Sequence, residues 1–159
     1  MKLLYPLLIL LPVGMPKEIL NVNNGSLARC STTGMALTGW TRSGQCVDEN
    51  EDSGSHHICI DLKTTTTEKN FCEVTDQPNW CDEKDVCDDN QEEKCERSHW
   101  CVCQWAFASY IENAGGCNKI QDVVCEATNM EALKAYEEKQ SESSKIAAAL
   151  ACLREKCNI

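Results

Sequence analysis

The chain has 159 residues, of which 42% are hydrophobic and 13 are cysteines, and its formal net charge is −10 at pH 7. This length fits one ordinary domain with a short processing segment. The negative charge argues against a nucleic-acid partner, which selects a basic face, and the hydrophobic content argues against a disordered chain. No apolar run reaches the roughly 18 residues of a transmembrane span.

Residues 1–16 have the layout of a secretory signal peptide. Lys2 precedes an apolar stretch over residues 3–13, and one positive charge followed by a short apolar core is typical of such peptides. Pro6 and Pro12 disfavour the alternative, a buried N-terminal helix, because proline breaks helix interiors. We therefore predict a signal peptide over residues 1–16 and localisation in the secretory pathway, either extracellular or in an organelle lumen.

The region that follows predicts loops and one strand. Asn24 begins an Asn-Gly-Ser sequon, so it is a glycosylation candidate in a secreted chain. The sequence up to residue 55 is rich in Gly, Ser, Thr and Asn, which favours loops with short strands. The apolar run over residues 58–62 is typical of a buried strand.

Residues 48–52 carry the oxygen spacing of a calcium loop, because Asp48, Asn50 and Asp52 fall at its first, third and fifth positions. Ser53 and Cys59 stand where such a loop needs glycine and glutamate. We therefore expect no calcium here and interpret these acids as a solvated loop.

Residues 64–98 form an acidic segment with few apolar side chains. Such a segment buries too little apolar surface to order itself, and it contains four cysteines: Cys72, Cys81, Cys87 and Cys95. Two local disulfides would order it, and three pairings are open. Residues 82–96 and 48–52 together carry the whole net charge of the chain, so its acidity is local.

A helix is predicted over residues 100–113. Four residues at helical spacing would face the core: Val102, Trp105, Ala106 and Ser109. Gly115 and Gly116 follow, and glycine accepts the left-handed conformation that ends a helix. His99 is interpreted as a half-buried residue at the start of this helix rather than a ligand.

The C-terminal part predicts a second short strand over residues 123–126 and two helices. The first helix begins at Met130, capped by Thr128 or Asn129, and buries Met130, Ala132, Leu133 and Tyr136. The last helix buries Ile146, Ala149, Leu150 and Leu153. Strands and helices do not alternate regularly. We therefore predict an α+β fold, one compact disulfide-rich domain over residues 17–159 with a central helix and two C-terminal helices.

The cysteines and histidines permit three kinds of chemistry. Cys101 and Cys103 are too close in sequence to bond each other readily, and on a strand His57 and Cys59 would share a face. Cys59, Cys101, Cys103 and a histidine would hold zinc, or would form a thiol nucleophile beside a histidine base. Both need thiolates, which disulfides do not supply, and an oxidising compartment favours disulfides.

Two further pairs concern the C-terminal third. Cys152 and Cys157 would point about 140 degrees apart on one helix. They would therefore bond other partners unless the helix ends before Cys157. Cys117 and Cys125 flank a loop that a disulfide between them would close.

Several motifs occur together in one order. They are Asn21-Val22, Leu27, Cys30-Ser31, Met35, Gly39-Trp40, Arg42, Gly44, Cys46, Asp52, Gly54-Ser55-His56, Cys59, Trp100-Cys101-Val102-Cys103, Trp105, Glu126-Ala127-Thr128 and Ala132-Leu133. In this the chain resembles the family of small, mostly bacterial proteins called domain of unknown function 2237, over residues 20–62 and 98–136. The chain departs from the family pattern at three positions: Ala36, Gln45 and Asn129.

The resemblance implies an α+β fold and no established activity, with thiols that need not be oxidised in the relatives. It also implies a candidate shared site: Cys30, Arg42, Cys46, His56, His57, Cys59, Trp100, Cys101 and Cys103. Five cysteines fall on the family pattern and eight do not. The eight would form four disulfides, so we predict that the unpaired thiol belongs to the five.

Two functions fit the sequence. The first is a secreted or luminal binding or structural module, held by about six disulfides, whose protein or small-molecule partner is unknown. The second is a thiol- or zinc-centred enzyme or redox protein that uses Cys59, Cys101, Cys103 and a histidine. No signature of catalysis that would favour the second is present.

Overall fold

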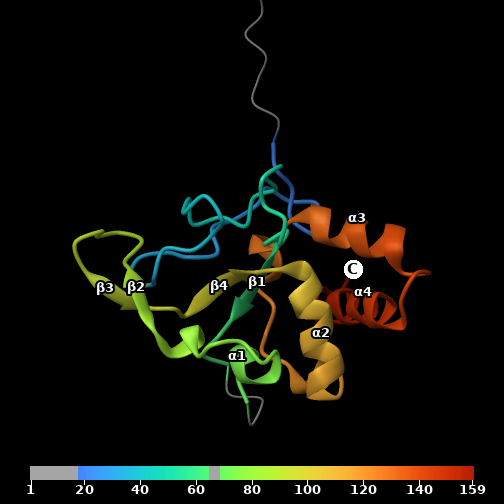
Figure 1. Ribbon diagram of the computed structural model, residues 1–159. Helices are drawn as coiled ribbons and strands as arrows, with labels where there is room; N and C mark the ends of the chain where they lie inside the picture. Colours follow the sequence, from blue (N-terminus) through green and yellow to red (C-terminus); the bar gives the residue numbers. More distant parts are fainter. Residues whose placement is uncertain (1–17, 65–68) are drawn as a thin grey trace, which may run out of the picture.

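The computed structural model describes residues 18–64 and 69–159, so the predicted signal peptide lies outside the described residues. Two short antiparallel sheets organise the chain (Figure 1). Strand β1 (Ile58–Asp61) pairs with β4 (His99–Val102), and Cys59 stands directly opposite Cys101. Strand β2 (Lys84–Val86) pairs with β3 (Lys94–Glu96) in a separate ribbon within the acidic segment.

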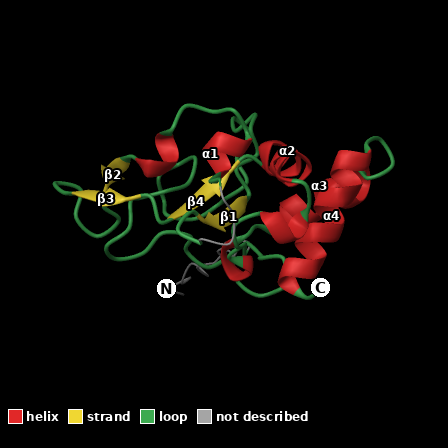
Figure 2. Cartoon of the chain, turned by 90° about the horizontal axis from the view of Figure 1, so that it is seen from below, coloured by secondary structure: helices red, strands yellow, loops and turns green. Residues whose placement is uncertain are grey.

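Three longer helices pack beside the β1–β4 pair. They are α2 (Gln104–Ala114), α3 (Met130–Lys139) and α4 (Ser144–Cys157). A single-turn helix, α1 (Phe71–Val74), lies in the acidic segment. Helices α2, α3 and α4 gather at one end of the molecule and the β2–β3 ribbon projects at the other (Figure 2). The predicted α+β class is confirmed.

The main core lies between the β1–β4 pair and helices α2 and α4. Ile58 and Ile60 from β1, Phe107 and Tyr110 from α2, and Leu153 from α4 are fully buried. Ile58, Ile60 and Leu153 come from segments whose apolar spacing predicts burial. Phe107 and Tyr110 lie outside the stripe predicted for their helix. No helix in the described ranges is both long enough and apolar enough to cross a membrane.

The prediction of the central helix gives its C-terminal end correctly, but its first residue and its buried face are wrong. Gly115 ends α2 in the left-handed conformation, with a φ of 85°. Residues 100–102 are strand rather than helix, because they complete the ladder with β1. Helix α2 therefore starts at Gln104 and buries Phe107, Ala108, Tyr110 and Ile111. Trp105, Ala106 and Ser109 are only partly buried.

The C-terminal helices agree more closely with the sequence. Asn129 caps α3 by accepting a hydrogen bond from the Glu131 N–H at 3.0 Å. Ala149, Leu150 and Leu153 are buried on α4 as predicted, and Ile146 is half-buried. The predicted strand over residues 123–126 is wrong. Only Val123 bridges to β1, and a 3-10 turn over Cys125–Ala127 follows.

All thirteen cysteines lie in the described part of the chain, and six disulfides use twelve of them. The eight cysteines outside the family pattern do pair among themselves: Cys72–Cys81, Cys87–Cys95, Cys117–Cys152 and Cys125–Cys157. The predicted loop closure between Cys117 and Cys125 is wrong, because each bonds a cysteine of α4. Cys152 and Cys157 find separate partners, as their helical spacing requires.

Candidate functional site

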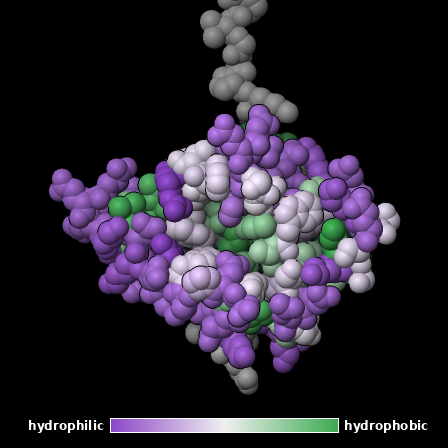
Figure 3. All heavy atoms as spheres, viewed as in Figure 1, coloured by the Kyte–Doolittle hydropathy of each residue, from purple (hydrophilic) through white to green (hydrophobic). Residues whose placement is uncertain are grey.

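A cavity of about 280 Å³ lies where three separate segments meet. It is lined by Gly39, Trp40, Arg42, His56, Trp100 and Cys101. We call it the family cavity, because all six residues stand in the motifs that resemble the family. In the space-filling view, apolar and neutral residues gather over β4 and the start of α2, within a hydrophilic surround (Figure 3).

The loop that carries Trp40 and Arg42 is a tight, strained turn. Gly39 has a φ of 92°, and a Cβ at this position would lie 2.4 Å from the Gln45 carbonyl oxygen, so only glycine fits. Arg42 has a φ of 54°, which non-glycine residues rarely adopt. Such strain is held only where the surrounding structure enforces it, and it gathers at functional sites.

Two aromatic walls bound the cavity. The Trp40 indole stacks on the His56 imidazole, with ring centroids 5.6 Å apart and planes 16° apart. Trp40 is nevertheless 50% exposed, so it offers an uncovered apolar ring. The Arg42 guanidinium lies 5.1 Å from the Trp100 ring centroid, as in a cation–π pair. The cavity therefore presents both a flat apolar surface and a positive charge.

Arg42 is only weakly neutralised. Its nearest carboxylate belongs to Asp85, at 3.9 Å, and its side chain is 52% exposed. Asp85 has a stronger partner in Arg97, at 3.0 Å. Burial would raise the pKa of Asp85, but its bonds to Arg97 and the Val86 N–H outweigh burial and lower that pKa. The positive charge of Arg42 is thus available to interact with a ligand in the cavity.

The Asp52 carboxylate holds the His56 imidazole in its orientation. The His56 Nδ1 atom lies 2.7 Å from the buried Asp52 carboxylate, which also accepts hydrogen bonds from the His56 and Gly54 backbone N–H groups. Burial would raise the pKa of Asp52, but these hydrogen bonds outweigh burial and hold the pKa below its usual value. An ionised Asp52 requires a proton on Nδ1, which in the neutral ring leaves Nε2 as an acceptor. The interpretation of Asp52 as part of a solvated loop is therefore wrong.

A second cavity, of about 170 Å³, shares His56, Trp100 and Cys101 with the first. Its other lining residues include Trp80 of the acidic segment and Cys103, the one unpaired cysteine. Trp80 and Trp100 lie with ring centroids 6.0 Å apart. The acidic segment thus covers the side of the site on which the free thiol lies.

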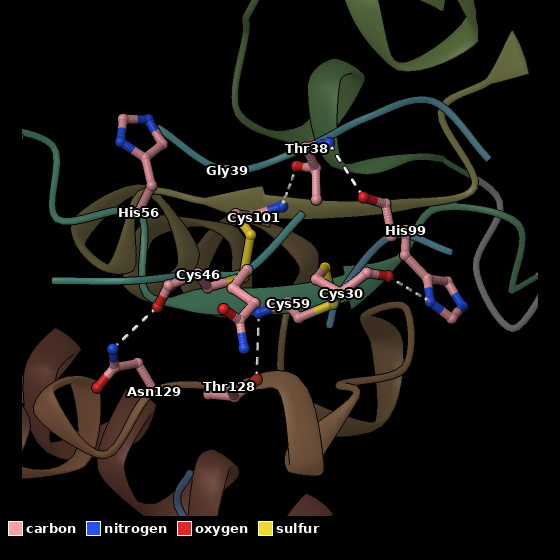
Figure 4. The surroundings of a disulfide bond; sticks show 12 residues. Cys30, Thr38, Gly39, Cys46, His56, Cys59, His99, Cys101, Thr128 and Asn129 are labelled. Atoms are coloured by element: carbon pink, nitrogen blue, oxygen red, sulfur yellow. Dashed lines mark hydrogen bonds between the residues drawn. A yellow bond between two sulfur atoms is a disulfide. The ribbon is translucent and has the colours of Figure 1, made fainter. Parts of the chain in front are cut away.

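The four other family cysteines form two adjacent disulfides, Cys30–Cys59 and Cys46–Cys101 (Figure 4). The unpaired thiol is therefore one of the five, as predicted. A zinc or thiolate site made of Cys59, Cys101 and Cys103 is not present in this state, because two of the three sulfurs are in disulfides. The odd number of cysteines requires at least one unpaired thiol, but it gives neither the number of disulfides nor the pairings.

The remaining candidate residues do not line the family cavity. His57 is buried between the Gln104 side-chain oxygen at 2.9 Å and Asp48 at 3.0 Å, so its role is structural. His99 lies on β4, not at a helix start, and contacts the Cys30 carbonyl oxygen at 3.1 Å. Asn24 is exposed on a turn. The candidate site predicted from the sequence does not include Trp40, Asp52 or Trp80. Trp40 and Asp52 stand on the family motifs, whereas Trp80 does not.

Comparison with known protein families matches residues 20–144 to uncharacterised proteins conserved in bacteria, domain of unknown function 2237. A search of curated proteins gives no match to the chain.

Proposed function

We propose that this chain, which belongs to the family of uncharacterised bacterial proteins called domain of unknown function 2237, is a secreted or luminal binding module for a small, flat organic anion. It is a disulfide-stabilised protein, and the family cavity is its binding site. The observation that carries the proposal is that every residue lining this cavity stands on a family motif, although the motifs are far apart in the sequence.

The walls of the cavity define the ligand. Its volume of about 280 Å³ lies at the small end of the range for ligand pockets. The half-exposed Trp40 ring suits a planar group, and Arg42 suits a carboxylate, which guanidinium groups bind in a forked geometry. His56 adds a hydrogen-bonding edge that Asp52 holds in place. An aromatic or similarly flat carboxylate meets all three features.

The paired cysteines support the proposed compartment. Twelve of thirteen thiols are paired, and disulfides are typical of proteins in oxidising surroundings. The signal-like residues 1–16 agree with this. Expression of the full chain in a secreting host should release a protein that begins after residue 16, with one alkylatable thiol by intact mass. A cytosolic product with many free thiols would contradict secretion.

Binding is tested with benzoate as the probe and benzamide as its uncharged control. Tryptophan fluorescence should report saturable binding of benzoate, because two indole rings line the cavity. Arg42→Gln should weaken binding by about tenfold or more, the effect of losing a charge-assisted pair. Arg154→Gln is the matched control, since Arg154 is similarly exposed on α4 and pairs with Glu137. Equal binding of benzamide, or equal effects of both variants, would contradict the proposal.

A second function, thiol chemistry at Cys103, is favoured by one observation. Cys103 and His56 line the same cavity, and Asp52 fixes the proton on the far nitrogen of that histidine. This is the order of groups that activates a cysteine nucleophile. His56→Gln should slow alkylation of Cys103 by iodoacetamide at neutral pH, whereas His99→Gln should not. No difference between the two variants would leave Cys103 as an inert thiol.

A further inference from the structure

We infer that Cys30, Cys46, Cys59 and Cys101 form a tetrathiolate zinc site when the chain folds in its reduced state. The two disulfides of the present structure are then the oxidised form of one four-sulfur centre. This inference does not depend on the proposed ligand or on the family cavity.

Three of the four sulfur atoms, those of Cys30, Cys46 and Cys59, lie within 4.8 Å of one another. The Cys101 sulfur lies outside this group but is bonded to Cys46, one of its members. Cys59 and Cys101 are directly opposite on β1 and β4, while Cys30 and Cys46 arrive on two separate loops. Two separate disulfides do not require their four sulfur atoms to lie around one point, whereas a tetrahedral zinc ion does.

Hydrogen bonds that do not involve sulfur hold the main chain of these four cysteines in place (Figure 4). The Cys101 N–H donates to the Thr38 hydroxyl at 2.9 Å, and the Cys59 N–H donates to the Thr128 hydroxyl at 3.1 Å. The Asn129 side chain donates to the Cys46 carbonyl oxygen at 2.9 Å. The Cys30 N–H donates to the Gly44 carbonyl oxygen at 2.7 Å. None of these bonds involves sulfur, so reduction of the two disulfides should leave the backbones of the four cysteines near one another.

The four sulfurs are a donor set that suits zinc. Zinc binds thiolates at about 2.3 Å, which places tetrahedral sulfurs roughly 3.8 Å apart. The four cysteines are at most 2% exposed, and their neighbours Ala28, Val124 and Ala127 are small and apolar. Four uncharged thiols would form few favourable interactions in these apolar surroundings. A bound metal ion offsets the free-energy cost of burying four thiolates there.

Conversion of the disulfide form to the zinc form begins with reduction. Two molecules of a dithiol supply four electrons and four protons to the two sulfur–sulfur bonds, giving four cysteine thiols and two oxidised dithiols. Zinc then displaces four protons and forms four zinc–sulfur bonds. Because all four sulfurs are buried, neither state should convert to the other without opening of the chain. The redox conditions during folding therefore decide which form is made.

The test refolds the full, fully reduced chain from denaturant with zinc and a dithiol, without oxygen, and then removes unbound metal. One zinc per chain is expected, together with protection of Cys30, Cys46, Cys59 and Cys101 from alkylation, mapped by peptide mass. Cobalt in place of zinc should give the absorption of a tetrahedral sulfur site. The oxidised protein should retain no zinc.

Two variants make the result decisive. Cys46→Ser should weaken zinc affinity by more than the roughly 10- to 100-fold that a lost outer-shell contact costs. Cys72→Ser is the matched control, because Cys72 is equally buried and disulfide-bonded but belongs to another pair. The inference is overturned if the reduced chain retains no zinc or does not fold with it, if other cysteines are protected, or if both variants lose zinc equally.

Discussion

The β1–β4 pair and the acidic segment are held together in opposite ways. The disulfides at the pair join cysteines 29 and 55 residues apart, and those of the acidic segment join cysteines only 9 and 8 residues apart. The long-range disulfides connect loops and strands that form the family cavity, whereas the short ones only order a segment with little core of its own. The comparison separates disulfides that position a site from disulfides that permit a segment to fold.

The acidic segment also contacts the rest of the molecule through charged side chains rather than through a large apolar face. Asp88 accepts hydrogen bonds from Arg29 and Ser31, and Glu96 pairs with Lys63. The bond to Lys63 lowers the pKa of Glu96, and the bonds to Arg29 and Ser31 lower that of Asp88 against the effect of burial. Surface ion pairs of this kind contribute little stability each. The main apolar attachments are Phe71, which packs on Tyr110 of α2, and Trp80, which packs on Trp100.

The largest expected effect tests this contrast directly. Replacing Cys46 and Cys101 together by serine should lower the free energy of unfolding by about 4 kcal/mol, and replacing Cys87 and Cys95 should lower it by about 2.5 kcal/mol, because a longer closed loop restricts the unfolded chain more. Urea unfolding followed by tryptophan fluorescence measures both. If the two double variants lose the same stability, loop length does not distinguish the two regions.

The division of the cysteines could be predicted because the resemblance to the family marks five of them and leaves an even number over. The pairings of Cys117 and Cys125 could not, since they depend on where α4 docks. The start of α2 was misplaced for a related reason: residues 100–102 are apolar at a spacing that fits either a helix or a strand, and only the partner strand decides.

The site shows the same limit. Arg42, His56 and Trp100 were named from motifs, and the structure brings them to one cavity. Nothing in the sequence indicates that Trp80, from the acidic segment, would cover the side where Cys103 lies, because that contact joins two regions with no shared pattern. Likewise, the acids near residue 50 read as a solvated loop, although Asp52 is buried against His56.

The next prediction concerns the backbone support of the β1–β4 pair. Thr38→Val keeps the shape of the side chain but removes the acceptor for the Cys101 N–H. Leaving a buried N–H without a partner should cost about 2 kcal/mol of unfolding free energy. Thr41→Val is the control, because Thr41 is exposed on the same loop. A loss of less than about 0.5 kcal/mol, the usual range for surface substitutions, would show that this bond does not hold the pair.

A smaller effect tests whether the acidic segment covers the free thiol. Trp80→Ala should speed alkylation of Cys103 by about tenfold, since it removes a wall of the smaller cavity and so favours local opening. Ile159→Ala should leave the rate unchanged, because Ile159 is also a partly exposed apolar residue but lines neither cavity. The rate is measured with iodoacetamide under native conditions. Unchanged reactivity in Trp80→Ala would mean that the segment lies beside the thiol without covering it.

The smallest expected effect is the pH dependence contributed by Asp52, which belongs to the family motifs and not to the acidic segment. Its pKa is lower in the folded state than its usual value of 3.8, so its ionised form stabilises the fold above that value. This stabilisation is lost as the pH falls below 3.8 through the folded-state pKa. Asp52→Asn, which keeps an acceptor oxygen but does not ionise, should flatten this part of the unfolding profile. Asp89→Asn should not, because Asp89 is exposed and lies in the acidic segment. If both variants change the acid limb equally, acid unfolding reports the summed charge of the chain rather than the one buried carboxylate that orients His56.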